Sequence, residues 1–148
     1  MSVKASNWIH GTSVQVETNS WFASRTGTGT IVKPGGPNAS GYVHFAIPTP
    51  TSLALVPTKG KLAMILVKLG PKAIIDHFQV IDGEDRIVDI PVNFRDNGSP
   101  TPQFFPVPIP STAGKINWGV GISFNIRFDG VTPDASVKLI GAGIEFIY

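Results

Sequence analysis

Residues 118–129 carry the clearest pattern in the chain. The even-numbered positions from Trp118 to Phe128 are all apolar, whereas the odd-numbered positions from Gly119 to Asp129 are glycine or polar. Successive side chains of a β-strand point to opposite faces, so this alternation predicts one long strand with a buried face. The same pattern predicts that Trp118 points into the core with the apolar residues that follow it.

A second alternation predicts a β-hairpin. Residues 86–94 are apolar at alternate positions, and the apolar stretch 74–81 precedes them. The Asp82-Gly83 pair between them is a strong turn signal. Residues 82–85 bring three carboxylates together, but the segment is too short for a calcium-coordinating loop. We therefore expect a solvated hairpin tip.

Further strands are predicted between turns rich in Gly, Pro and Asn, at residues 14–18, 28–33, 42–48, 62–69, 104–109 and 137–148. No segment shows helical periodicity. This spacing predicts an all-β fold, an antiparallel β-sandwich that is jelly-roll-like, with a closed β-barrel as the alternative. We expect a single β-sandwich domain over residues 1–148, because the loop at 33–41 is too short to separate two domains.

Prolines mark one strand as the rim of a sheet. Pro106, Pro108 and Pro110 stand at alternate positions of the segment 104–109 and its end. Alternate residues of a strand aim their backbone N–H groups at the same edge, and proline has no N–H to donate. The segment is therefore predicted to lie at an edge that resists further strand pairing.

The sequence lacks the residue sets that most catalytic and metal sites need. It has no cysteine, and its histidines, His10, His44 and His77, stand far apart, without the closely spaced pair of a cupin-type metal site. Asp76 and His77 are adjacent, so on a regular strand they face opposite sides. No Gly-x-Ser-x-Gly segment is present. We expect no metal ion, no cofactor and no catalytic residues.

Aromatic and polar side chains supply the candidates for ligand binding. Trp8 with His10, and separately Trp21, lie in segments that are typical of turns. An aromatic ring there stacks on a sugar or an apolar ligand if exposed, or closes the end of the sandwich if buried. Tyr42 and His44 share the strand face that points away from the core. We predict that these five residues bind ligand.

Glycine leaves two strands with flat strips. Gly119, Gly121 and Ser123 occupy one face of the longest strand, and Gly141 and Gly143 recur in the last one. A strip without side chains allows a neighbouring strand, a subunit or a ligand ring to approach closely. Close packing of strands or subunits is the favoured interpretation.

Charge and hydropathy narrow the range of partners. The net charge is +2, and the twelve basic residues are scattered, which argues against a nucleic-acid surface. No apolar run reaches the length of a membrane span, and the N-terminal segment lacks a signal-peptide core, so we expect a cytoplasmic protein with no membrane partner. The expected partners are a carbohydrate or a small apolar ligand, and further copies of the chain in a homo-oligomer.

Three segments together resemble an uncharacterised bacterial family, a domain of unknown function whose members are small all-β proteins. They are Trp8-Ile9-His10-Gly11-Thr12, His44-Phe45-Ala46-Ile47-Pro48-Thr49-Pro50 and Trp118-Gly119-Val120-Gly121-Ile122-Ser123. The resemblance covers most of the chain and implies an all-β fold. No established activity comes with it, so it assigns no catalytic residue.

The first functional hypothesis is a non-catalytic β-sandwich module that binds a ligand such as a glycan, or that assembles with itself. It follows from the missing catalytic set, the glycine strip and the aromatic segments. The second is an enzyme of the isomerase or cyclase type, working inside a small β-barrel with His44, His10 or Asp76 as general base. The third, a structural component of a larger particle, rests on fold analogy.

Overall fold

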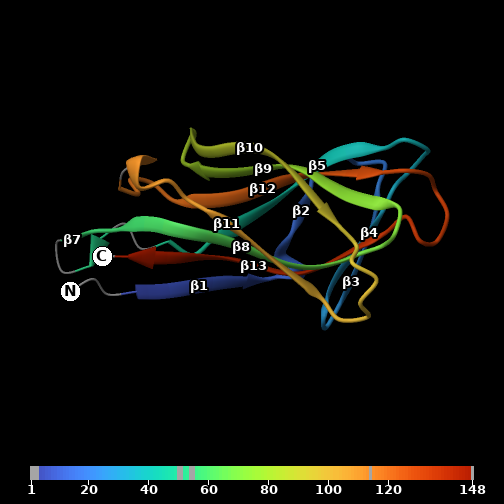
Figure 1. The fold of residues 1–148 in the computed structure, drawn as a ribbon, viewed down its shortest axis with the longest axis horizontal. Coiled ribbons are helices and arrows are strands. Elements are labelled where there is room, and N and C mark those ends of the chain that lie inside the picture. Colours follow the sequence, from blue (N-terminus) through green and yellow to red (C-terminus); the bar gives the residue numbers. More distant parts are fainter. Residues whose placement is uncertain (1–3, 50–51, 54–55, 114, 148) are drawn as a thin grey trace.

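Two antiparallel β-sheets pack face to face, as Figure 1 shows. The structure is a computed structural model that describes residues 4–49, 52–53, 56–113 and 115–147. Its elements are β1 (Lys4–His10), the 3-10 helix η1 (Gly11–Ser13), β2 (Gln15–Val16), β3 (Phe22–Thr26), β4 (Gly29–Lys33), β5 (Ser40–Ile47), β6 (Ser52–Leu53), β7 (Val56–Pro57), β8 (Lys59–Leu69), β9 (Ala73–Asp82), β10 (Asp85–Arg95), β11 (Gln103–Pro108), the 3-10 helix η2 (Ser111–Ala113), β12 (Val120–Phe128) and β13 (Val137–Ile147).

The two sheets share no strand, which confirms the predicted β-sandwich and excludes a closed barrel. Sheet A has the order β11-β8-β13-β4-β3, and β1 pairs with the remaining part of the β13 edge. Sheet B has the order β10-β9-β12-β5-β2, and β6 and β7 form a separate two-stranded ribbon. In the described part of the chain, neither 3-10 helix has the length or hydropathy to cross a bilayer.

The core lies between the sheets and is built from the alternating positions of both. Aromatic rings fill its sheet B side: Phe124 of β12 stacks on Phe78 of β9 and on Phe45 of β5, with ring centroids 6.2 and 6.1 Å apart. Aliphatic side chains of β8 and β13, such as Ile65 and Ile144, are equally buried on the sheet A side. Burial of each large side chain contributes about 2 kcal/mol, so this layer stabilises the whole sandwich.

Strand β12 confirms the alternation predicted for residues 118–129, with one exception. Its apolar positions from Val120 to Phe128 are buried, and β12 pairs with β5 on one side and β9 on the other. Trp118 does not share this burial. It precedes the strand and is 76% exposed, so the prediction that it points into the core is wrong.

The proline-rich strand lies at an edge of its sheet, as its prolines predict. β11 ends the strand order of sheet A, and its single partner, β8, lies between β11 and β13. The position of β8 inside the sheet accounts for the apolar residues on both of its faces.

The segments around Trp8 and Trp21, whose composition is typical of turns, belong to a strand or lie directly beside one. Trp8 and His10 belong to β1, which pairs along β13 from Lys4 opposite Ile147 to His10 opposite Gly141. Phe22 begins β3, the far edge of sheet A, whose residues are all exposed. The flat glycine strip of β13 explains the first case, because it gives β1 a close partner that the local composition of β1 does not reveal.

The predicted hairpin is present, but its tip is not fully solvated. β9 and β10 pair around Gly83, which has φ +61°. The side chain of Asp82 is 2% exposed and turns inward, contrary to the solvated tip expected from three adjacent carboxylates. The single-domain organisation over residues 1–148, the homo-oligomeric state and the cytoplasmic location stay predictions.

Candidate functional site

The outer face of sheet B, which points away from sheet A, carries a row of polar side chains that face the same way. Register places Gln15, His44, Ser123, Gln79 and Asp89 opposite one another on β2, β5, β12, β9 and β10. Residues directly opposite in an antiparallel sheet lie on the same face. The row therefore crosses the whole sheet, and the name polar face is used below for this surface.

A hydrogen-bonded chain fixes one half of the polar face. The Nδ1 atom of His44 lies 2.6 Å from the hydroxyl of Ser123, and its Nε2 atom lies 2.6 Å from the carboxylate of Glu17. The ring of Tyr42 stacks on that of His44 with an interplanar angle of 10°. The rotamers of these side chains are thereby set before any ligand arrives, which lowers the entropic cost of binding.

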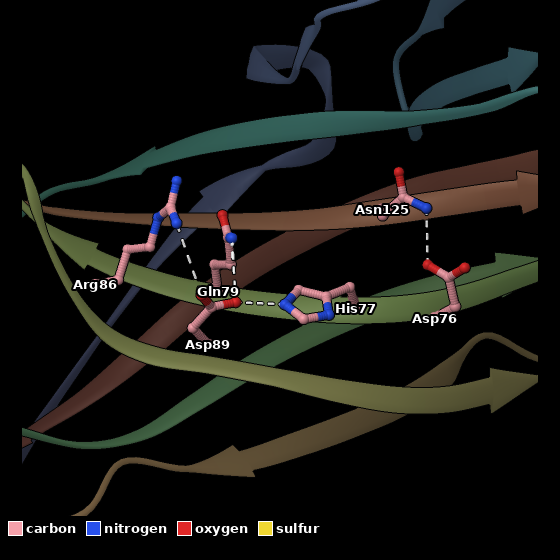
Figure 2. Close-up of polar contacts among 6 residues, drawn as sticks. All are labelled: Asp76, His77, Gln79, Arg86, Asp89 and Asn125. Carbon is pink, nitrogen blue, oxygen red and sulfur yellow. Dashed lines mark hydrogen bonds and ion pairs between the residues drawn. The ribbon is translucent and has the colours of Figure 1, made fainter.

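A β-bulge places two adjacent residues on the polar face. In the β12–β9 ladder Asn125 is opposite His77 and the next residue, Ile126, is opposite Ile75, so Asp76 is left unpaired. The amide of Asn125 donates to the Asp76 carboxylate at 2.7 Å, as Figure 2 shows. The expectation that Asp76 and His77 face opposite sides is therefore wrong, because a bulge breaks the two-residue period.

Asp89 is the centre of the other half of the polar face. Its carboxylate accepts hydrogen bonds from His77 and from the amide of Gln79, and the guanidinium of Arg86 lies 3.8 Å away (Figure 2). The hydrogen bond with His77, and then that with Gln79, lower the pKa of Asp89 below its ordinary value. Asp89 is thus an ionised acceptor at neutral pH.

The phenol of Tyr42 has the opposite tendency. Burial raises the pKa of Tyr42, and the nearby carboxylates of Asp89 and Asp76 raise it further. The hydroxyl therefore keeps its proton at neutral pH and can donate it to a ligand oxygen.

An open cleft lies on the polar face beside this network. It has a volume of about 430 Å³, and its lining includes Ala46, Gly119, Gly121, His44 and Ser123. The small residues leave its floor flat, and a Cβ atom built at Gly121 would meet just the carbonyl oxygen of Phe45, at 3.4 Å. The glycine strip predicted from the sequence thus forms the floor of a cleft on the outer surface.

Trp118 is not part of the cleft lining, but it lies next to Gly83, which is, and its backbone is well supported. Asp82 accepts hydrogen bonds from the backbone N–H groups of Asn117, Trp118 and Gly119, at 2.8, 2.9 and 3.1 Å. The indole ring packs against Gly83, which also lines the cleft. A buried carboxylate thus fixes the backbone segment that presents this large aromatic ring to solvent.

The structure separates the five predicted ligand-binding residues. Tyr42 and His44 lie together on the polar face. Trp8 and His10 lie on sheet A, where Trp8 is 44% exposed and the Nδ1 atom of His10 accepts the N–H of Thr12. Trp21 is 7% exposed, and its ring packs on Phe128, as in the alternative in which it closes the sandwich. Ligand binding by all five stays a prediction.

The residues proposed as general bases do not converge. His44 and Asp76 are on the polar face of sheet B, whereas His10 ends a strand of sheet A. Among the residues that the structure describes, no three His, Asp or Glu side chains gather in a group that could hold a metal ion.

Sequence reasoning missed the parts of this site that depend on distant contacts. The exposure of Trp118 rests on Asp82, which is 36 residues away in the chain. No local pattern marks that contact. The cluster around Asp89 could have been found from the predicted hairpin, because its register brings alternate polar residues of both strands together.

Comparisons with known proteins give a family and a fold. The sequence profile of a family described as "Family of unknown function (DUF6623)" matches residues 2–148. No curated protein matches the chain.

Several solved carbohydrate-binding modules have a similar fold. A family 35 carbohydrate binding module from Clostridium thermocellum has a TM-score of 0.56 at 10% identity, covering 95% of this chain and 97% of that one. A family 29 module from Piromyces equi has a TM-score of 0.54 at 12% identity, covering 97% and 90%. The low affinity xylan binding module CBM86 from Roseburia intestinalis has a TM-score of 0.52 at 13% identity, covering 96% and 94%. The shared feature is the β-sandwich.

Proposed function

We propose that this chain, which belongs to the family of unknown function DUF6623, is a non-catalytic module that binds a neutral glycan on the polar face of sheet B. The observation that carries this proposal is Trp118, an exposed ring that packs against Gly83 at the edge of an open cleft and whose backbone N–H is bound by the buried carboxylate of Asp82. Exposing a large apolar ring costs free energy in water, so a rigidly exposed Trp is typical of a binding site.

The chemistry of the face suits a sugar chain. Trp118 offers an apolar plane for the C–H face of a pyranose ring, and Tyr42, Gln79 and Asn125 offer donors and acceptors for its hydroxyl groups. The flat floor at Gly119 and Gly121 leaves room for the chain to lie across the strands.

Charge pairing points to a neutral ligand. Asp89 is matched by Arg86 at 3.8 Å, and Asp76 by Arg127 at 3.7 Å, so neither sign is left in excess at the centre of the face. An anionic polymer would meet these carboxylates as like charges. The β-sandwich that the chain shares with carbohydrate-binding modules supports the same proposal as a fold-level analogy.

Affinity electrophoresis in gels containing soluble xylan, β-glucan or galactan tests the proposal, followed by titration calorimetry with the retarding polysaccharide. We expect at least one gel to retard the wild-type chain. Trp118→Ala should weaken binding about thirtyfold, since loss of a central aromatic anchor costs about 2 kcal/mol. Phe22→Ala, which removes a ring that is 68% exposed at the edge of sheet A, is the matched control and should bind as wild type.

Two results would overturn the proposal. One is a wild-type chain that is retarded by no polysaccharide in the panel. The other is a Trp118→Ala variant that binds as tightly as the Phe22→Ala control.

A further inference from the structure

A second cavity lies on the opposite sheet, away from the polar face. It has a volume of about 490 Å³ and forms where the outer side of β8 and β13 meets the loops that follow β8, β10 and β12. Its polar lining comprises Lys68, Asp96, Ser99, Asp134, Ser136 and Lys138. None of these residues takes part in the network around Asp89 or in the support of Trp118.

Two lysines stand side by side at this cavity. Lys68 and Lys138 are directly opposite in the antiparallel β8–β13 ladder. Their neighbours Val67, Leu69, Val137 and Leu139 are buried, so both lysines point to the outer face of sheet A. Like charges at directly opposed positions destabilise a sheet slightly, so an anion bound between the two lysines would be stabilising.

The two lysines form no ion pair within the described part of the chain, although the carboxylates of Asp96 and Asp134 line the same cavity. Among the described residues neither lysine has a carboxylate within 4.0 Å, and the Nζ atom of Lys138 donates to the Thr28 hydroxyl at 2.6 Å. The two acids of the cavity are engaged in their own loops. Asp96 accepts the N–H of Gly98 at 3.0 Å, and Asp134 accepts the hydroxyl of Thr132.

We propose that this cavity binds an anionic sugar unit, with its carboxylate or sulfate between Lys68 and Lys138. Two adjacent ammonium groups match the oxygens of one such anion by charge-assisted hydrogen bonds. The remaining lone pairs of Asp96 and Asp134 and the hydroxyls of Ser99 and Ser136 then face the hydroxyl groups of the ring. The volume falls within the range of cavities that hold small ligands.

The site is independent of the proposed function, since it uses other residues on the other sheet. A neutral glycan on the polar face and an acidic sugar unit in this cavity would give one module two contacts with a mixed polysaccharide. Linked sites of this kind gain affinity from effective concentration.

Titration calorimetry at low ionic strength tests the proposal with the full chain. The probes are glucuronate and galacturonate for the carboxylate arm, a sulfated monosaccharide for the sulfate arm, and glucose, acetate and inorganic sulfate as references. We expect one acidic sugar to bind more tightly than all three references, because the reference compounds each lack either the charge or the hydroxyl groups. Added salt should weaken the binding.

The double variant Lys68→Gln/Lys138→Gln should lose about tenfold or more in affinity for that sugar. The control Lys33→Gln/Lys59→Gln, which removes the same charge from sheet A outside the cavity, should stay within about twofold. Without ligand, the cavity variant should melt no lower than wild type, since like-charge repulsion is removed. Trp118→Ala should bind the acidic sugar as wild type, which separates this site from the polar face.

Three outcomes would overturn the proposal: glucose binding as tightly as the acidic sugars, acetate or sulfate binding as tightly as they do, or wild-type affinity in the double variant. The first result would show that charge does not contribute to binding, and the second that the sugar ring does not. The third would show that the lysine pair is not the binding site.

Discussion

The outer faces of the two sheets carry different kinds of side chain. On sheet B, opposed residues form hydrogen-bonded pairs such as Gln79 with Asp89 and His44 with Ser123. On sheet A the matching row is apolar: Trp8, Gly143, Met64 and Pro106 are opposite one another on β1, β13, β8 and β11. An outward position in a strand is therefore no guide to polarity, and the two faces suit different ligands.

The charged residues are also distributed differently over the two sheets. Within their described ranges the strands of sheet A contain a single acidic residue, Glu145, and several lysines, two of which lie 4.0 and 3.9 Å from it. The strands of sheet B carry both signs, and Asp89 and Asp76 lie 3.8 and 3.7 Å from the guanidinium groups of Arg86 and Arg127. This difference is the basis for proposing a neutral ligand for sheet B and an anionic one for the lysine pair of sheet A.

The largest effect on this contrast should come from Asp82, which holds Trp118 in solvent. Asp82→Ala leaves three backbone N–H groups without their acceptor in a part-buried place, and we expect the free energy of unfolding to fall by about 3 kcal/mol. Glycan affinity should fall with it, because the ring loses its fixed position. Urea denaturation measures the first effect and calorimetry the second.

Asp129→Ala is the control, because the carboxylate of Asp129 is exposed and lies 4.0 Å from Arg127. It should change the unfolding free energy by less than about 0.5 kcal/mol. Equal losses in the two variants would show that the buried carboxylate does not support the Trp118 loop.

The β-sandwich was predictable because its core follows the two-residue period. Strands such as β12 and β5 keep that period over their whole length, and the edge position of β11 follows from its prolines. Tyr42 and His44 were placed outward for the same reason. A regular strand transmits its register from residue to residue, so a local pattern suffices.

The missed features depend on departures from that period or on distant contacts. The bulge at Asp76 adds one residue to β9 and brings two adjacent side chains to one face. The exposure of Trp118 depends on Asp82 across the hairpin, and the strand identity of Trp8 depends on glycines near the other end of the chain. Alternation alone encodes none of these contacts.

The same substitution on the two faces should have unequal effects. A Cβ atom at Gly143 would lie 2.7 Å from the Trp8 ring and 2.8 Å from the carbonyl oxygen of Asn7, whereas at Gly121 the nearest atom is 3.4 Å away. We expect Gly143→Ala to lower the unfolding free energy by about 1–3 kcal/mol and Gly121→Ala to change it by less than about 0.5 kcal/mol. Thermal and urea unfolding measure both.

For glycan binding, the substitution at Gly121 should have the larger effect and that at Gly143 the smaller one. Gly121→Leu, which fills the cleft floor, should abolish glycan binding in the retarding gel, and Gly143→Ala should keep it at temperatures where the variant is folded. Retention of binding by Gly121→Leu would place the glycan elsewhere and remove the functional side of the contrast.

The smallest effect should be the response of sheet B to acid. The pKa of Asp89 in the folded chain is lowered below the ordinary value of 3.8, mainly by its hydrogen bond with His77. A carboxyl with a lowered pKa stabilises the folded state above the unfolded-state pKa, and this contribution disappears as the pH falls through the folded-state value. Asp89→Asn should therefore lose less stability than wild type between pH 5 and about pH 2.

Urea unfolding at a series of pH values measures this difference, with Glu84→Gln as the control. Glu84 is an exposed carboxylate in the same hairpin, and it forms no hydrogen bond or ion pair within the described part of the chain. Parallel curves for wild type and Asp89→Asn would mean that the contact with His77 contributes nothing in solution. The side chains around Asp89 would then be no more fixed than the lysines of sheet A. The evidence that the polar face is preorganised for a ligand would come from His44 and Trp118 alone.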